Sequence, residues 1–254
     1  MKATRFRDSA YRKWLEIRRP DTSEYSGVDD AGYYFVHDEH TGSPVFVSHQ
    51  RRLAYYRNGV EARVSNLARE YCVDNLSLTS SDQVVDVGAH SGEFGLWAGR
   101  FSAHYVGIEP DPIAFGALER NFPTGALEKL ACGAERGVAE FSLATSTGDS
   151  SFGSSGGRVI QVVVERLDDV VNRNFPSGRI AVLKVEAEGF EPEVLRGADQ
   201  TLQRTDVVTV DAGEEREGKS TAPECVNILL KAGFELRQVF LRRGVFLFES
   251  VKKP

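Results

Sequence analysis

The chain has 254 residues, 41% of them hydrophobic, which is enough for one α/β domain with a sizeable core and an extension. Its formal net charge of −6 argues against a general nucleic-acid binder, because phosphate contacts need clustered cations. No apolar run approaches the length of a membrane span, and the charged N-terminus is not typical of a signal peptide. The three cysteines are scattered without metal-ligand spacing, so we expect a protein of the reducing cytoplasm.

Residues 1–52 are predicted to form an extension that begins with a helix. Phe6, Ala10, Trp14 and Ile17 recur at helical spacing among arginine and lysine residues. One interpretation is that this helix packs on its own domain or on the second subunit of a homodimer. The alternative is that its basic face contacts an anionic membrane surface.

The extension is predicted to continue as a β-hairpin. Residues 33–36 and 45–47 are β-prone runs, and residues 41–44 supply the turn between them. His37 and His40 flank the turn, but no ligand spacing from elsewhere accompanies them. We therefore expect a solvated loop here rather than a metal site.

The main domain is predicted to cover residues 53–254 and to open with a helix over residues 53–78. Val64, Leu67 and Tyr71 lie on one stripe of that helix.

Residues 84–87 form a β-branched run that predicts a buried parallel strand, and residues 94–100 predict the helix that follows. A strand, a glycine-containing turn and a helix in this order are half of a nucleotide-binding crossover. We expect Asp86 to face the turn amides and the charged end of a cofactor, although a purely structural turn would also explain the pattern. The candidate cofactor-binding residues of this stretch are Asp86, Gly88, Ala89, His90, Ser91 and Gly92.

A second short strand ends in Glu109, about 20 residues after the first turn, where an acidic residue binds ribose hydroxyls in such folds. Pro110 and Asp111 then close the strand and begin a helix, and they join Glu109 as candidate cofactor-binding residues. The alternative for Glu109 is a solvated strand end.

Residues 127–133 predict a third strand that ends in small residues. Ala131 and Cys132 leave room for a flat adenine ring at the sheet edge, although core packing explains Cys132 equally well. Residues 138–143 and 159–164 predict two more strands, separated by a Ser- and Gly-rich segment.

Residues 180–185 predict a central strand whose end brings Glu186 and Glu188 to the edge of the sheet where ligands bind. Alternation would place Lys184, Glu186 and Glu188 on one face if the strand runs that far. A cation beside two carboxylates would then adjust their titration.

The remaining elements complete an α/β pattern. Residues 206–211 predict a further strand, and residues 225–233 predict an amphipathic helix whose inward residues include Leu230. Residues 234–236 and 244–249 predict an antiparallel pair of strands that closes the sheet.

Four segments together resemble the FkbM-type S-adenosylmethionine-dependent methyltransferases. Residues 183–198, Leu-Lys-Val-Glu-Ala-Glu-Gly-Phe-Glu-Pro-Glu-Val-Leu-Arg-Gly-Ala, are similar to the family's long signature, with Glu186 where the family usually has Asp. The other similar segments are residues 84–95, residues 107–112 with Asn121, and residues 163–170, so that the resemblance covers about residues 55–249.

The resemblance implies transfer of the S-adenosylmethionine methyl group to a hydroxyl on a sugar of a glycan, glycolipid or secondary metabolite. It also implies that Arg63 pairs with the cofactor carboxylate, although a surface ion pair would explain Arg63 as well. Asp149 matches an acidic-Ser-Ser element of the family, in a segment that is either a loop over the site or a plain connector.

A hydroxyl is a poor nucleophile at neutral pH, so methyl transfer needs a group that takes its proton. Glu188 is the first candidate for this base, Glu186 the second and His90 the third, with Lys184 beside them. The alternative is a divalent metal shared by Glu186, Glu188 and Asp211.

The sequence thus predicts a Rossmann-like methyltransferase fold with a mostly parallel sheet, an antiparallel edge strand and helices on both faces. Two other classes of function stay open. A dinucleotide-dependent oxidoreductase would need a third close glycine after Gly88, which the turn lacks. A non-catalytic binding module on a methyltransferase fold would explain the Glu at position 186.

Overall fold

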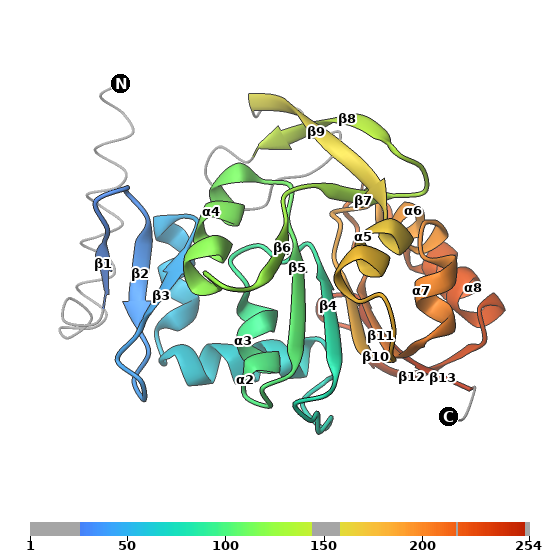
Figure 1. The fold of residues 1–254 in the computed structure, drawn as a ribbon, viewed down its shortest axis with the longest axis horizontal. Helices are drawn as coiled ribbons and strands as arrows, with labels where there is room; N and C mark the ends of the chain where they lie inside the picture. Colours follow the sequence, from blue (N-terminus) through green and yellow to red (C-terminus); the bar gives the residue numbers. More distant parts are fainter. Residues whose placement is uncertain (1–25, 144–157, 217, 252–254) are drawn as a thin grey trace.

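The structure is a computed structural model that describes residues 26–143, 158–216 and 218–251 (Figure 1). The predictions for the N-terminal helix, for the Ser- and Gly-rich segment and for Asp149 lie outside the described residues. None of the described helices combines the length and the hydrophobicity that a membrane crossing requires.

The predicted hairpin is confirmed and belongs to a three-stranded antiparallel sheet. The sheet consists of β1 (Ser26–Val28), β2 (Tyr34–His37) and β3 (Pro44–Val47). In the turn, the Asp38 side chain accepts hydrogen bonds from the amides of His40 and Thr41. Asn121 binds the backbone of Phe46 at both its amide and its carbonyl, which ties this small sheet to the main domain.

The single helix predicted over residues 53–78 is wrong in its extent. The segment forms a short 3₁₀ helix, η2 (Gln50–Tyr56), followed by α2 (Val60–Glu70). Gly59 separates them because its φ of 91° is incompatible with a continuous helix, and Cys72 at φ 59° ends the second one. The predicted apolar stripe is nevertheless buried along α2.

The central sheet has seven strands in the order β12-β13-β11-β10-β4-β5-β6 (Figure 1). β13 runs antiparallel to both of its neighbours, β11 and β12. It lies second from the edge of the sheet, and β12 forms that edge. The direction of winding reverses between β4 and β10, and ligands bind at such switch points. The strands are β4 (Gln83–Val87), β5 (His104–Ile108), β6 (Ala126–Glu128), β10 (Ile180–Val185), β11 (Thr205–Asp211), β12 (Phe234–Phe240) and β13 (Val245–Ser250).

Residues 127–133 do not form the one strand that the sequence predicted. The Glu109 amide, just past the end of β5, donates to the Glu128 carbonyl at 3.0 Å, and β5 offers no partner beyond this point. The chain then leaves the central sheet. The segment from Ala131 joins a separate sheet of β7 (Ala131–Gly133), β9 (Arg158–Arg166) and β8 (Gly137–Leu143), seen at the top of Figure 1.

Helices cover both faces of the central sheet because its buried strands are apolar on both sides. Val85, Leu183 and Val208 pack toward the core of the α5–α8 side, whereas Val84 and Val182 pack toward α2, α3 and the N-terminal sheet. The helices are α3 (Glu93–Gly99), α4 (Pro112–Asn121), α5 (Leu167–Asn174), α6 (Glu191–Arg196), α7 (Asp199–Gln203) and α8 (Ala222–Lys231).

The prediction that Leu230 of α8 (Ala222–Lys231) points into the core is wrong. Leu230 is 50% exposed, whereas Cys225 and Leu229 are buried. The helix contacts the sheet through positions spaced by three and four residues, and Leu230 is one residue beyond that stripe.

Candidate active site

A cavity of about 560 Å³ opens at the carboxyl ends of β4, β5, β10 and β11. Most of the residues that the sequence proposed for cofactor binding or catalysis line this one cavity. They are Arg63, Gly88, Ala89, His90, Glu109, Pro110, Asp111, Ala131, Cys132, Lys184, Glu186 and Glu188. Asp86 and Ser91 are fully buried and do not line it.

The turn after β4 requires a glycine for a reason of packing as well as of conformation. Gly88 has a φ of 73°, and a Cβ at this position would lie 1.9 Å from the carbonyl oxygen of Glu186. The amides of Gly88 and Ala89 donate to the carbonyl of Ile108, at 2.9 and 3.0 Å. The turn is therefore fixed against the ends of both neighbouring strands.

The expectation that Asp86 faces the turn amides is wrong. Its carboxylate lies 3.0 Å from the Lys184 ammonium and accepts a 2.8 Å hydrogen bond from the Tyr105 hydroxyl. Both partners come from neighbouring strands. Asp86 is in register with Lys184 of β10 and with Gly107 of β5, and Tyr105 lies two residues before Gly107, so the three side chains project from the same face of the sheet.

Glu109 lies just past the end of β5 with its carboxylate held by two backbone amides. His90 donates to Oε2 and Asp111 donates to Oε1, each at 2.8 Å. Burial raises the pKa of Glu109 to about 7, although the two amide hydrogen bonds work in the opposite direction. Each oxygen keeps a second lone pair, so the carboxylate can still accept hydrogen bonds from a vicinal diol in the cavity.

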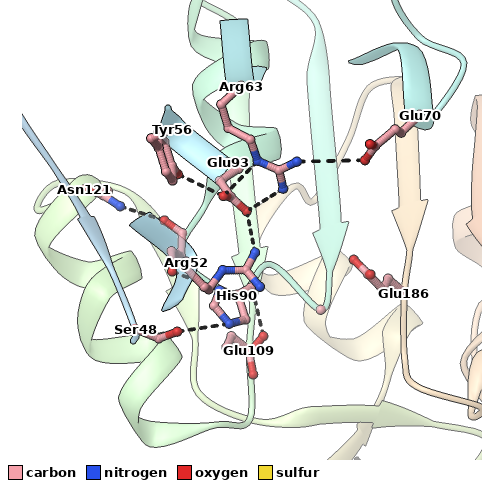
Figure 2. A network of polar contacts seen from close by, with 12 residues as sticks. Ser48, Arg52, Tyr56, Arg63, Glu70, His90, Glu93, Glu109, Asn121 and Glu186 are labelled. Carbon is pink, nitrogen blue, oxygen red and sulfur yellow. Dashed lines mark hydrogen bonds and ion pairs between the residues drawn. The ribbon is translucent and has the colours of Figure 1, made fainter. Parts of the chain in front are cut away.

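Two other residues that the sequence proposed for cofactor binding have structural partners of their own. The Asp111 side chain caps α4 by accepting hydrogen bonds from the amides of Ile113 and Ala114. The His90 ring lies 3.1 Å from the Ser48 hydroxyl (Figure 2). Its other nitrogen lies 2.9 Å from the Ser91 hydroxyl. His90 does not cap α3, because Gly92 occupies the N-cap position.

Ala131 and Cys132 are buried at the wall of the cavity, close to the apolar side chains of Leu130 and Phe141 that also line it. Burial raises the pKa of the Cys132 thiol, so this side chain is a neutral packing surface rather than a nucleophile. Small residues beside an aliphatic and an aromatic side chain form a wall against which a flat ring can lie. Phe141 comes from β8, which the sequence did not connect with the site.

Lys184 connects the ends of β4 and β10. Its ammonium lies 3.0 Å from both Asp86 and Glu186, and it donates to the carbonyl of Gly88 at 2.6 Å. Burial disfavours the charged form, but Asp86 and Glu186 outweigh it and raise the pKa of Lys184. The side chain is therefore a permanent cation whose hydrogen-bonding capacity is used within the protein.

Glu186 is the most strongly paired carboxylate of the site. It accepts a 2.5 Å hydrogen bond from the Tyr71 hydroxyl and pairs with Lys184 and with Arg243. Burial opposes ionisation, but Arg243 and Lys184 hold the pKa of Glu186 well below its usual range. A carboxylate with such a low pKa is a weak proton acceptor. Glu186 is therefore better suited to orienting neighbouring groups than to taking a proton.

Glu188 does not continue the face of β10, because the strand ends at Val185. It lies in the following turn with a φ of 48° and is partly exposed at the cavity wall. The buried Glu191 holds this turn, since its Oε1 accepts from the amides of Ala187 and Gly189 at 3.0 and 2.9 Å. A strained φ that the surrounding structure maintains is frequent at functional sites.

The Arg63 side chain is buried and paired, so it is neither part of a surface ion pair nor an unpaired cation. Arg63 and Arg52 both pair with Glu93, at 3.1 and 2.8 Å, and the Tyr56 hydroxyl donates to the same carboxylate at 2.9 Å (Figure 2). All four side chains are buried, and the two guanidinium groups line the cavity. Within this group the two guanidinium groups share the one carboxylate of Glu93.

The ion pairs around Glu93 and the ion pairs around Glu186 are joined into one network. Glu70 lies 3.9 Å from Arg63 and 3.1 Å from Arg243, and Arg243 also donates to Asp211 at 2.6 Å. Sequence reasoning missed Arg52, Tyr71, Glu93 and Arg243 as site residues. Their partners are distant in the chain, so no local pattern in the sequence identified them.

The described residues contain no group of three His, Cys, Asp or Glu side chains arranged to hold a metal ion. In that part of the chain the carboxylates of Glu186 and Asp211 pair with Arg243 instead.

Residues 86–236 match the family model described as the methyltransferase FkbM domain, which covers more than half of the chain. The chain belongs to the FkbM methyltransferase family. A curated relative, the methyltransferase sdnD of Sordaria araneosa, is 26% identical over 239 aligned residues, which cover 77% of this chain and 91% of sdnD.

Solved structures share the fold of this FkbM methyltransferase domain. A crystal structure of methyltransferase FkbM from Methylobacillus flagellatus KT aligns with a TM-score of 0.50 at 17% identity over 78% of this chain. The present chain spans only 59% of that longer protein. The METTL16 methyltransferase domain aligns with a TM-score of 0.50 at 10% identity, over 95% of this chain and 92% of its own. The predicted family and fold class are thus confirmed.

Glu93→Gln should strongly destabilise this FkbM domain. The substitution leaves two buried guanidinium groups without their carboxylate, and breaking a buried ion pair from one side costs about 3–5 kcal/mol. Urea denaturation with linear extrapolation measures the free energy of unfolding. The matched control is Glu61→Gln, which breaks the exposed pair with Arg100 and should change stability by about 0–1 kcal/mol. Equal effects of the two substitutions would contradict a structural role for the Arg52–Glu93–Arg63 group.

Proposed function

We propose that the protein is an S-adenosylmethionine-dependent O-methyltransferase that acts on a hydroxyl of a sugar in a glycan, glycolipid or secondary metabolite. The observation that carries this proposal is the continuity of the cavity. One end has the strand-tip carboxylate and apolar wall that suit a nucleoside, and the other end has the charged groups around Glu186 and Glu188. Its volume, about 560 Å³, is in the range of small-molecule sites.

The residues of the first end fit the proposed cofactor. Glu109 would accept hydrogen bonds from the two ribose hydroxyls, and the wall at Ala131 and Cys132 would contact the adenine ring. Arg63 and Arg52 line this end of the cavity and would bind the cofactor carboxylate through their guanidinium groups. When bound, S-adenosylmethionine supplies a methyl group that its sulfonium already activates for transfer.

The residues of the second end would prepare the acceptor. In the proposed reaction, a bond forms between the acceptor oxygen and the methyl carbon while the carbon–sulfur bond breaks, and its electron pair stays on sulfur. Glu188 takes the hydroxyl proton as this happens. Lys184 and Glu186 keep the turn after β4 and the turn after β10 in a fixed relation, which aligns the two substrates.

The carboxylates at this end of the cavity favour a polyhydroxylated acceptor, because carboxylate oxygens accept hydrogen bonds from hydroxyl groups. The family relationship supports a methyltransferase in preference to an oxidoreductase. Calorimetric titration with S-adenosylmethionine and with NAD separates these two classes, and a labelled-methyl screen of glycan and polyketide acceptors identifies the substrate.

Glu109→Gln should weaken S-adenosylmethionine binding by about tenfold or more, because a charged acceptor of two hydroxyl hydrogen bonds becomes neutral. Isothermal titration calorimetry measures the affinity. In the wild type, the affinity should also rise as the pH increases through about 7, since the pKa of Glu109 is raised to about 7 and the charged form is the better acceptor. The variant should lack this pH dependence. The control is Glu128→Gln, which alters an exposed pair with Arg173 and should bind the cofactor normally. A pH-independent wild-type affinity would contradict the role of Glu109.

Glu188→Gln should lower kcat by about 10²- to 10⁴-fold and leave S-adenosylmethionine affinity unchanged, because the variant loses a proton acceptor without losing a cofactor contact. Single-turnover transfer of labelled methyl to an acceptor from the screen measures the rate. Full activity of the variant would remove Glu188 as the base. The same assay with a chelator tests the metal alternative, and activity should be unaffected.

A further inference from the structure

Asp211 is the last residue of β11 and lies beside the end of β10, where Val185 is in register with Val210. Its side chain is 1% exposed, yet the residue lines the cavity. Oδ2 accepts a 2.6 Å hydrogen bond from Nε of Arg243. Oδ1 is buried and has no hydrogen-bond partner among the described residues. A buried carboxylate oxygen without a donor is costly, so its position requires an explanation.

The neighbouring donors are committed elsewhere. The Lys184 ammonium contacts Asp86, Glu186 and the Gly88 carbonyl, and the Tyr71 hydroxyl donates to Glu186. Arg243 pairs with Glu186, Glu70 and the other oxygen of Asp211. These side chains leave Oδ1 without a donor, and because Asp211 lines the cavity, a bound ligand is a source from which the donor can come.

We infer that Asp211 binds a second hydroxyl of the acceptor, next to the hydroxyl that is methylated, so that the enzyme selects a vicinal diol over an isolated alcohol. This inference rests on the proposed function. Asp211 ends β11, and Glu188 lies in the turn after the neighbouring strand β10. Both line the same cavity, so they can contact adjacent hydroxyls of one sugar ring. Asp211 would thus be a specificity-determining residue for the methyl acceptor.

A hydroxyl matches the surroundings of Asp211 better than an ammonium does. The Arg243 guanidinium and the Lys184 ammonium lie close by and would repel a second cation. Burial, with the nearby charge of Glu186, raises the pKa of Asp211 to about 7. Near neutral pH the Asp211 carboxyl is therefore present in both its charged and its neutral form. It can accept a hydrogen bond from a hydroxyl or donate one to it. The charged and titratable groups around it are Glu70, Tyr71, Lys184, Glu186, Glu215 and Arg243.

The test measures binding of methyl glycosides of glucose, galactose and mannose, and of their monodeoxy analogues, to the full chain saturated with S-adenosylhomocysteine. Isothermal titration calorimetry compares the wild type with Asp211→Asn, an isosteric change that keeps an oxygen for Arg243. The matched control is Asp206→Asn, at the other end of the same strand, where the carboxylate pairs with the exposed Arg179. The control should bind all ligands as the wild type does.

We expect the wild type to bind a parent glycoside about 10- to 100-fold more tightly than one of its deoxy analogues, as for a hydrogen bond to a charged group. In Asp211→Asn this preference should shrink to about threefold or less, with S-adenosylhomocysteine affinity unchanged. The inference is overturned if the wild type shows no preference for any parent glycoside, whether both ligands bind or neither does. It is also overturned if Asp211→Asn lowers kcat alone, because Asp211 would then act on the reacting proton.

The two hypotheses fail in different ways. Absence of S-adenosylmethionine and S-adenosylhomocysteine binding to the wild type would contradict the proposed function itself. Normal cofactor binding and methyl transfer, combined with equal binding of parent and deoxy glycosides, would contradict only the role of Asp211.

Discussion

The site depends on one buried cation, the Lys184 ammonium between the carboxylates of Asp86 and Glu186. Removing three charges from water is costly, and the pairing is tolerable only because each partner has further hydrogen bonds. Tyr105 binds Asp86, Tyr71 binds Glu186, and the Gly88 carbonyl accepts from the ammonium. This arrangement joins the ends of β4 and β10 at the switch point of the sheet, where the proposed cofactor and acceptor halves of the cavity meet.

Charge in this cavity is divided between fixed and titratable groups. Glu93 and Glu186 are each held by two cations, which keeps their pKa values low and makes them parts of the scaffold. Glu109 and Asp211 are buried with less compensation, and their pKa values of about 7 leave them responsive to a bound ligand. Carboxylates of the same chemistry thus serve different purposes because their neighbours differ. A substrate that brings hydrogen-bond donors would supply further hydrogen-bond partners to Glu109 and Asp211.

The sequence predicted the fold and the strand ends that border the cavity, because these features are local. Alternating and continuous apolar runs identified the strands of the central sheet, and the acidic residue after the second strand identified the position of Glu109 at the sheet edge. The family signature around Glu186 located an edge of the sheet that lines the cavity. Two local predictions failed, because Gly59 divided a predicted helix and residues 127–133 were shared between two sheets. The roles of Arg52 and Arg243 follow from tertiary pairing, which periodicity does not encode.

The most direct test of the account is a crystal structure of the protein with S-adenosylhomocysteine bound. The account predicts that the ribose hydroxyls contact Glu109, that the adenine ring lies against Ala131 and Cys132, and that the sulfur lies toward Glu186 and Glu188. A nucleoside bound away from the ends of β4 and β5, or a Glu188 side chain directed away from the cavity, would contradict it.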